Sequence, residues 1–124
     1  MKLRILGNSI RLRLTQSEVA TFGEQGRVVE HTRFGPGETL SYALEASDRV
    51  DQLAVRYDGK CVTVLAPSAS VSGWVETNQV GLEGEQPIDG DDVMTILVEK
   101  DFKCLHGPED RVEADAFPNP LAQD

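Results

Sequence analysis

Aromatic, cysteine and histidine residues are scarce in this chain, so few side chains are available to form a reactive site. Aromatic residues make up 6% of its 124 positions, and it contains two cysteines and two histidines. Its apolar runs are short and interrupted, as in residues 92–99, whereas a membrane-spanning helix needs about 20 apolar residues. Polar and charged residues follow the first residues too closely for the apolar segment of a secretory signal peptide to form. We therefore expect a cytoplasmic protein with an aliphatic core and no membrane partner.

Short motifs that mark common catalytic sites are also missing. The sequence contains no glycine-rich phosphate loop, no Gly-x-Ser-x-Gly and no His-Glu-x-x-His. The segment Asp89-Gly-Asp-Asp92 lacks the regular acidic spacing of a calcium-binding loop and predicts a polar turn between two strands. We therefore expect a protein that is not an enzyme.

Cys104 and His106 form the one candidate metal site in the sequence. One residue separates them, so an extended backbone would place the thiolate and the imidazole on the same side. A structural zinc ion takes four ligands, mostly Cys and His, and His31 is the only other histidine. A catalytic Cys-His pair would also need an orienting group and an oxyanion hole. The favoured interpretation is a chain without a cofactor, and zinc on Cys104 and His106 is the alternative.

Charge is spread unevenly along the chain, which has a net charge of −9. Residues 1–33 contain six Lys or Arg and three Glu, giving +3, so residues 34–124 carry −12. Such an acidic balance opposes the approach of DNA unless a positive face is segregated from the rest. The basic residues near the N-terminus therefore form either a binding face or a solvated hairpin surface.

Hydrophobic periodicity predicts the order strand, strand, helix, strand, strand in the first half. Residues 2–6 and 9–14 alternate apolar and polar side chains around Gly7-Asn8, which predicts a hairpin. Thr15-Gln-Ser-Glu18 has the form of a capping box, so a short helix should follow, with Val19 and Phe22 buried and an end at Gly23 or Gly26. Strands at 27–34 and 39–46 complete this half, joined by a Gly-Pro-Gly turn.

The second half repeats this order at an offset of 52 residues. Gly7 matches Gly59, Phe22 matches Trp74, and Val28 matches Val80. Five of the 28 residue pairs compared are identical, and core positions coincide with core positions. The expected elements of the second half are strands at 52–57, 61–66, 79–83 and 93–101 and a helix near 68–76.

From this repeat we predict a β-rich α+β fold that is mostly antiparallel. We expect two halves, at about 1–50 and 53–102, each with the order strand, strand, helix, strand, strand. The halves are expected to be related by pseudo-two-fold symmetry and to form a single domain. Residues 103–124 are acidic, contain proline and lack periodicity, so they predict an extended C-terminal arm.

The run from Gly7 to Val19, Gly-Asn-Ser-Ile-Arg-Leu-Arg-Leu-Thr-Gln-Ser-Glu-Val, resembles the swapped-hairpin domains of AbrB-type and MazE-type regulators. Those domains show a Gly-Asn-Ser turn, an alternating strand, a proline and a short helix. Thr15 stands at the proline position here, and Pro67 occupies it in the second half. Two chains exchange hairpins in that family, so the resemblance implies that a tandem copy forms an intramolecular pseudo-dimer.

Family members that bind DNA use basic residues on the first hairpin. The second half replaces Arg11 and Arg13 with Thr63 and Leu65, so a symmetric basic face is missing. The net charge also disfavours DNA as a partner. The residues at the family's DNA-binding positions are Lys2, Arg4, Asn8, Arg11 and Arg13.

The N-terminal string from Met1 to Val19 and the ending Asp115-Ala-Phe-Pro-Asn-Pro120 also resemble a family of short bacterial proteins of unknown function. This resemblance covers the chain but implies no activity. The leading hypothesis is an uncharacterised cytoplasmic interaction module with an unknown protein partner. The alternatives are a DNA-binding or antitoxin-like regulator and a small metal-binding protein.

Overall fold

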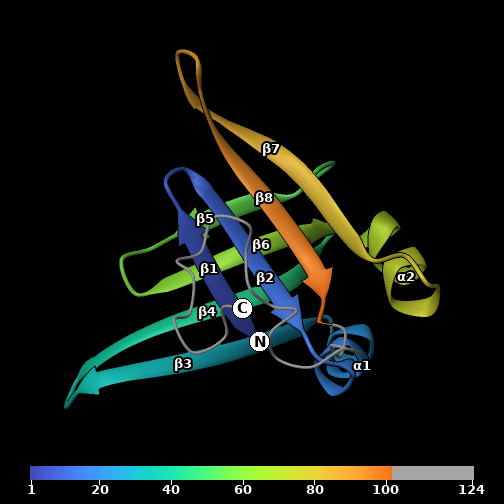
Figure 1. The fold of residues 1–124 in the computed structure, drawn as a ribbon, viewed down its shortest axis with the longest axis horizontal. Coiled ribbons are helices and arrows are strands. Elements are labelled where there is room, and N and C mark those ends of the chain that lie inside the picture. Colours follow the sequence, from blue (N-terminus) through green and yellow to red (C-terminus); the bar gives the residue numbers. More distant parts are fainter. Residues whose placement is uncertain (102–124) are drawn as a thin grey trace, which may run out of the picture.

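A computed structural model describes residues 1–101 of the chain. Within them, each half consists of a hairpin, a helix and a second hairpin (Figure 1). The elements of the first half are β1 (Lys2–Leu6), β2 (Ser9–Leu14), α1 (Gln16–Gln25), β3 (Arg27–Gly35) and β4 (Glu38–Ser47). Those of the second half are β5 (Ala54–Tyr57), β6 (Cys61–Pro67), α2 (Ser68–Glu76), β7 (Gly81–Asp89) and β8 (Asp92–Lys100).

The strands form two four-stranded sheets, and each sheet combines one hairpin from each half. Sheet A has the order β1-β2-β8-β7, and sheet B has the order β3-β4-β6-β5. The strands within each hairpin are antiparallel, whereas the halves meet through the parallel pairs β2–β8 and β4–β6. Because each half supplies two strands to each sheet, the halves are interlocked. The predicted β-rich α+β class with two similar halves is confirmed.

Backbone hydrogen bonds between the halves recur at matching positions. The Asn8 carbonyl accepts a hydrogen bond from the Thr95 N–H at 2.9 Å, and the Lys60 carbonyl accepts one from the Ser41 N–H at 2.9 Å. The β3–β4 and β7–β8 hairpins each contain a register shift shortly before their turns. The two halves therefore share not only the order of their elements but also the details of their ladders.

The offset between the halves changes along the chain, and this corrects one predicted match. The helices start 52 residues apart, whereas β3 and β7 start 54 residues apart. Val28 and Leu82 both pack against the core, but Val80 is 50% exposed, so the predicted match of Val28 with Val80 is wrong. The Val80 carbonyl instead corresponds to the Gly26 carbonyl, because each accepts a hydrogen bond from the last strand of its own half.

β7 is longer than its sequence predicted, since it continues past Glu83 to Asp89. The continuation contains Gly84 and Pro87, which weaken the local strand signal. Pairing with β8 holds this segment in a strand, although the local sequence does not predict one. Pro87 is tolerated because β7 is an edge strand, so one side of its backbone needs no ladder partner.

The hydrophobic core draws on both sheets and both helices. Phe22 and Trp74, the matching helix residues, are fully buried and meet edge to face, with ring centroids 6.1 Å apart and an interplanar angle of 67°. The Trp74 indole N–H donates to the Val80 carbonyl at 3.1 Å, so its polar atom is satisfied. Fully buried strand residues that surround this pair are Leu12, Leu14, Leu44, Val64, Ile96 and Val98.

Local chemistry explains where α1 begins and ends. The Thr15 hydroxyl accepts a hydrogen bond from the Glu18 N–H at 3.4 Å, and the Glu18 carboxylate accepts one from the Thr15 N–H at 2.9 Å, which confirms the predicted capping box. Gly26 ends the helix in the left-handed conformation, with φ of 75°. α2 starts after Pro67 without a side-chain cap.

Candidate functional site

The basic residues predicted to bind nucleic acid lie on the outer face of sheet A, and those on β2 alternate with the buried Ile10, Leu12 and Leu14. The β1–β2 register places Lys2 opposite Arg13 and Arg4 opposite Arg11. Asn8 occupies the turn at the end of this hairpin. The structure therefore brings the predicted residues together on one hairpin.

Carboxylates from the second half accompany this basic hairpin. Arg13 Nε and Arg11 Nη1 lie 3.4 and 3.8 Å from the same Glu99 oxygen on β8. Lys2 Nζ lies 3.0 Å from Asp101 Oδ2. β7, beyond β8, adds two exposed glutamates to the same sheet. The outer face of sheet A is thus a mixed-charge surface, which is a poor match to a polyphosphate backbone.

The outer face of sheet B carries a second group of basic residues that the sequence did not single out. Arg33 on β3 and Arg56 on β5 are exposed and lie on the two edge strands of the sheet. Within residues 1–101, no ion pair joins either arginine to a carboxylate, whereas Arg27 pairs with Glu45 at 3.2 Å. We call the face formed by Arg33, Arg56 and the residues between them the arginine face.

Small polar side chains fill the centre of the arginine face. The β3–β4 and β4–β6 registers place His31, Ser41 and Cys61 in one row. His31 Nδ1 lies 2.7 Å from the Ser41 hydroxyl, and Cys61 Sγ lies 3.6 Å from Thr63 Oγ1. His31 is exposed and Ser41 and Cys61 are half-buried, whereas Thr63 is buried, so the imidazole, the Ser41 hydroxyl and the Cys61 thiol are the groups that a ligand could reach.

A polar cleft of about 340 Å³ adjoins this face where β4 continues into the connection to β5. Two arginines, Arg49 and Arg56, and two carboxylates, Glu45 and Asp48, line it together with apolar side chains that include Leu65. Both arginines present planar guanidinium groups, which recognise carboxylates in a bidentate manner. The cleft therefore extends the arginine face toward the junction of the two halves.

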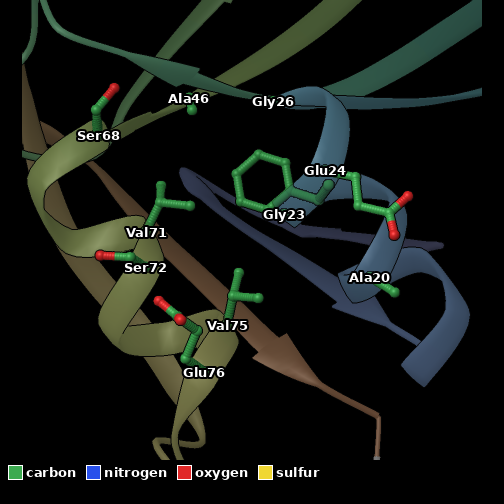
Figure 2. Close-up of a pocket in the computed structure, with 11 residues that line it drawn as sticks. Ala20, Gly23, Glu24, Gly26, Ala46, Ser68, Val71, Ser72, Val75 and Glu76 are labelled. Carbon is green, nitrogen blue, oxygen red and sulfur yellow. The ribbon is translucent and has the colours of Figure 1, made fainter.

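A shallow groove of about 550 Å³ separates α1 from α2 (Figure 2). Val71 and Val75 project from α2 toward α1, and each helix contributes one glutamate, Glu24 and Glu76. An added Cβ at Gly23 would lie 2.9 Å from Val75 Cγ1, so the helices are already in close contact beside the groove. The groove forms where the two halves meet.

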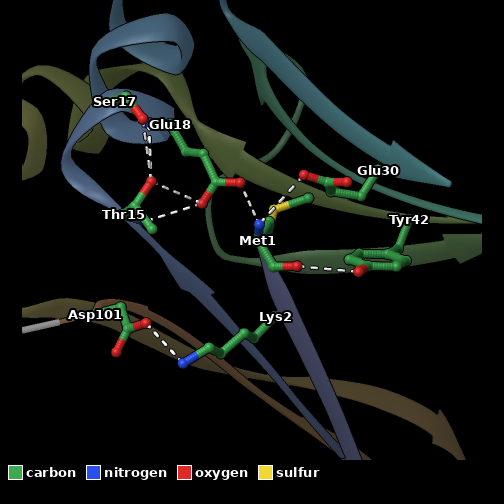
Figure 3. Close-up of polar contacts among 8 residues, drawn as sticks. All are labelled: Met1, Lys2, Thr15, Ser17, Glu18, Glu30, Tyr42 and Asp101. Atoms are coloured by element: carbon green, nitrogen blue, oxygen red, sulfur yellow. Dashed lines mark hydrogen bonds and ion pairs between the residues drawn. The ribbon is translucent and has the colours of Figure 1, made fainter. Parts of the chain in front are cut away.

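A charged cluster surrounds the amino group of Met1 (Figure 3). This ammonium pairs with Glu18 and lies 3.4 Å from Glu30 Oε1, while the Tyr42 hydroxyl donates to the Met1 carbonyl at 3.0 Å. Burial raises the pKa of Glu18, but the hydrogen bonds from the ammonium and from Thr15 outweigh it and leave the pKa below its ordinary value. The cluster anchors β1 to α1 and sheet B.

Burial raises the pKa of the Tyr42 hydroxyl, and the nearby carboxylates of Glu30 and Glu18 raise it further. Tyr42 therefore stays protonated and serves as a hydrogen-bond donor. The cluster consists of groups that satisfy one another, which suits a structural role.

Within residues 1–101, no group of three or more Cys, His, Asp or Glu residues is arranged to hold a metal ion. Cys104 and His106 lie outside the described residues, so zinc binding there stays a prediction. In the same part of the chain, no helix is long and apolar enough to cross a membrane.

Sequence reasoning missed the arginine face and the groove for the same reason. Arg33 and Arg56 lie far apart in the sequence and meet on one sheet only because the halves exchange hairpins. Glu24 and Glu76 are an identical pair at the 52-residue offset, and neither helix contains Lys or Arg. The matching glutamates and the absence of Lys and Arg from both helices are the sequence features that could have predicted an acidic groove.

The fold and these surfaces define a β-rich α+β protein built from two interlocked halves. The chain belongs to DUF7009, a family of unknown function, whose model matches residues 1–121. No curated protein and no solved structure matches the chain. The resemblance to swapped-hairpin regulators is not confirmed by these comparisons.

Proposed function

We propose that this protein is a non-enzymatic interaction module that binds an acidic segment of a partner protein on the arginine face. The observation that carries the proposal is the position of Arg33 and Arg56, exposed and without carboxylate partners among residues 1–101, in a chain of net charge −9. A positive surface segregated in this way steers an acidic partner to one side of the molecule.

The spacing of the two arginines indicates an extended ligand. Arg33 lies three strands away from Arg56 across the sheet and four residues away along the strand direction. Standard sheet dimensions convert this separation into a distance of roughly 19 Å. An extended peptide covers this distance with about six residues. The half-buried Ser41 hydroxyl lies in between and can donate to a carbonyl or carboxylate of such a segment.

A labelled peptide with two acidic clusters about six residues apart tests this function by fluorescence anisotropy at low ionic strength. Replacing Arg33 and Arg56 by Gln should weaken binding about tenfold, from the typical worth of two charge-assisted contacts. Replacing Arg11 and Arg13 by Gln changes the net charge equally and should leave the affinity within about twofold. Equal losses in both double variants would show general charge attraction and contradict the proposal.

Duplex binding by the first hairpin is the second candidate function. It is supported by the gathering of Lys2, Arg4, Arg11 and Arg13 on one face of sheet A. If this face binds DNA, Glu99→Gln should strengthen binding because it removes the carboxylate shared by two arginines. An electrophoretic mobility shift assay that finds no binding to mixed duplex at low salt for either protein would eliminate this candidate.

A further inference from the structure

The groove between α1 and α2 is a surface distinct from the arginine face, and it is lined by matching residues of the two halves. Ala20 corresponds to Ser72, and Glu24 corresponds to Glu76, at the 52-residue offset. Val71 and Val75 contribute apolar wall on the α2 side. A concave apolar floor with polar edges is the usual form of a site that receives side chains from a partner.

The electrostatics of the groove favour a cation. Glu24 lies in the last turn of α1, and Glu76 is the last residue of α2, and both are exposed. The C-terminal end of a helix carries roughly half a negative charge, so a carboxylate there is unfavourable and a cation is favourable. Neither helix has a basic residue in its last turn. Two exposed carboxylates thus line the groove, and neither helix contains Lys or Arg. At the end of α2, the Lys100 ammonium from β8 donates to the Thr77 carbonyl at 2.7 Å and offsets the negative end of that helix. The preference for a cation is therefore set by the two carboxylates and by the end of α1.

The size of the groove favours a peptide segment over a bound metal ion. About 550 Å³ is enough for several side chains. Within residues 1–101, no cluster of three metal-ligand residues occurs, and the floor is apolar. An aliphatic side chain would fill the floor beside Val71 and Val75. A long flanking Lys or Arg at the edge of the groove would approach the exposed carboxylate of Glu24 or Glu76.

From this charge complementarity we propose that the interhelical groove docks a basic, amphipathic segment of a partner protein. The groove and the arginine face then prefer ligands of opposite charge. This inference does not rest on the proposed function, because both glutamates and both valines of the groove lie on the helices, whereas Arg33 and Arg56 lie on the edge strands of sheet B.

A labelled helical peptide of alternating Lys and Leu pairs serves as the probe, with binding measured by fluorescence anisotropy on the full chain. Replacing Glu24 and Glu76 by Gln should weaken binding about tenfold. Replacing Glu83 and Glu85 on β7 by Gln changes the net charge equally and should leave the affinity within about twofold. The same loss in both double variants would overturn the proposal, because it would show attraction to the net charge alone.

A second variant tests the groove separately from its charge. Ala20→Leu with Ser72→Leu fills the groove from both helices and should abolish peptide binding, while circular dichroism confirms the fold. Unchanged affinity in this folded variant would overturn docking in the groove. Glu24→Gln with Glu76→Gln should keep or raise the melting temperature, because it removes carboxylates from helix C-terminal ends. Lost binding in that variant therefore cannot arise from unfolding.

Discussion

Phe22→Leu tests whether the two halves unfold as one unit. Phe22 belongs to the first half, is fully buried and contacts the ring of Trp74 in the second half. Loss of the edge-to-face ring pair should cost about 1 kcal/mol, and the smaller side chain should leave a cavity worth about 1 kcal/mol more. The free energy of unfolding should therefore fall by about 2 kcal/mol, which lowers the urea midpoint by about 1 M.

The chain's single tryptophan makes the assay specific. Fluorescence of Trp74 reports on the second half, whereas far-ultraviolet circular dichroism reports on both halves. The two unfolding curves should coincide in the wild type and shift together in Phe22→Leu. A fluorescence curve that stays at its wild-type midpoint while the dichroism curve splits would refute the shared core. Phe34→Leu, at a side chain that is 70% exposed, is the matched control and should change stability by less than about 0.5 kcal/mol.

Three further predictions concern the helix cap, the charged cluster and the domain boundary. Thr15→Ala should lower the free energy of unfolding by about 1 kcal/mol, whereas Ser17→Ala should change it little, as thermal denaturation can measure. The pKa of Glu18 is lower in the folded protein than its ordinary value of 4.5, so the Glu18 carboxylate stabilises the fold above pH 4.5, and this stabilisation is lost as the pH falls through the folded-state pKa. Glu18→Gln should therefore make the free energy of unfolding depend less on pH in the acid range. Limited proteolysis at residues 47–52 should yield no separately stable halves, and folded fragments of about 50 residues would contradict a single domain.

Local rules in the sequence were sufficient for the helices and the tight hairpins. The Thr15 capping box, the Gly26 stop and the alternation in β2 each depend on neighbouring residues, and the structure confirms them. The length of β7 and the exchange of hairpins depend on partners distant in the sequence, and no local pattern specifies them. Likewise, no local pattern marks the change from a 52-residue to a 54-residue offset after α2. A constant offset of 52 therefore matches Val28 with the exposed Val80 instead of with Leu82.

The candidate surfaces were harder to predict because each sheet face is assembled from both copies of the repeat. Glu99 from the second half accompanies Arg11 and Arg13 from the first. On sheet B, Arg56 from the second half lies across the sheet from Arg33 of the first. The basic hairpin is evident in the sequence of the first copy, but the carboxylate beside it comes from a distant strand of the second copy.

This interlocked arrangement explains how two similar halves can present unlike surfaces. Residues that form the shared core must keep their apolar character in both copies, because a polar group buried without a partner would destabilise the whole unit. Outward-facing residues carry no such requirement, so a substitution in either copy can change the charge of a face that includes the other copy. Phe22 and Trp74 show the first behaviour, and the exposed Asn8 with its exposed counterpart Lys60 shows the second. Duplication of the fold thus provides a common scaffold on which the outer face of sheet A, the arginine face and the interhelical groove can each acquire a different binding preference.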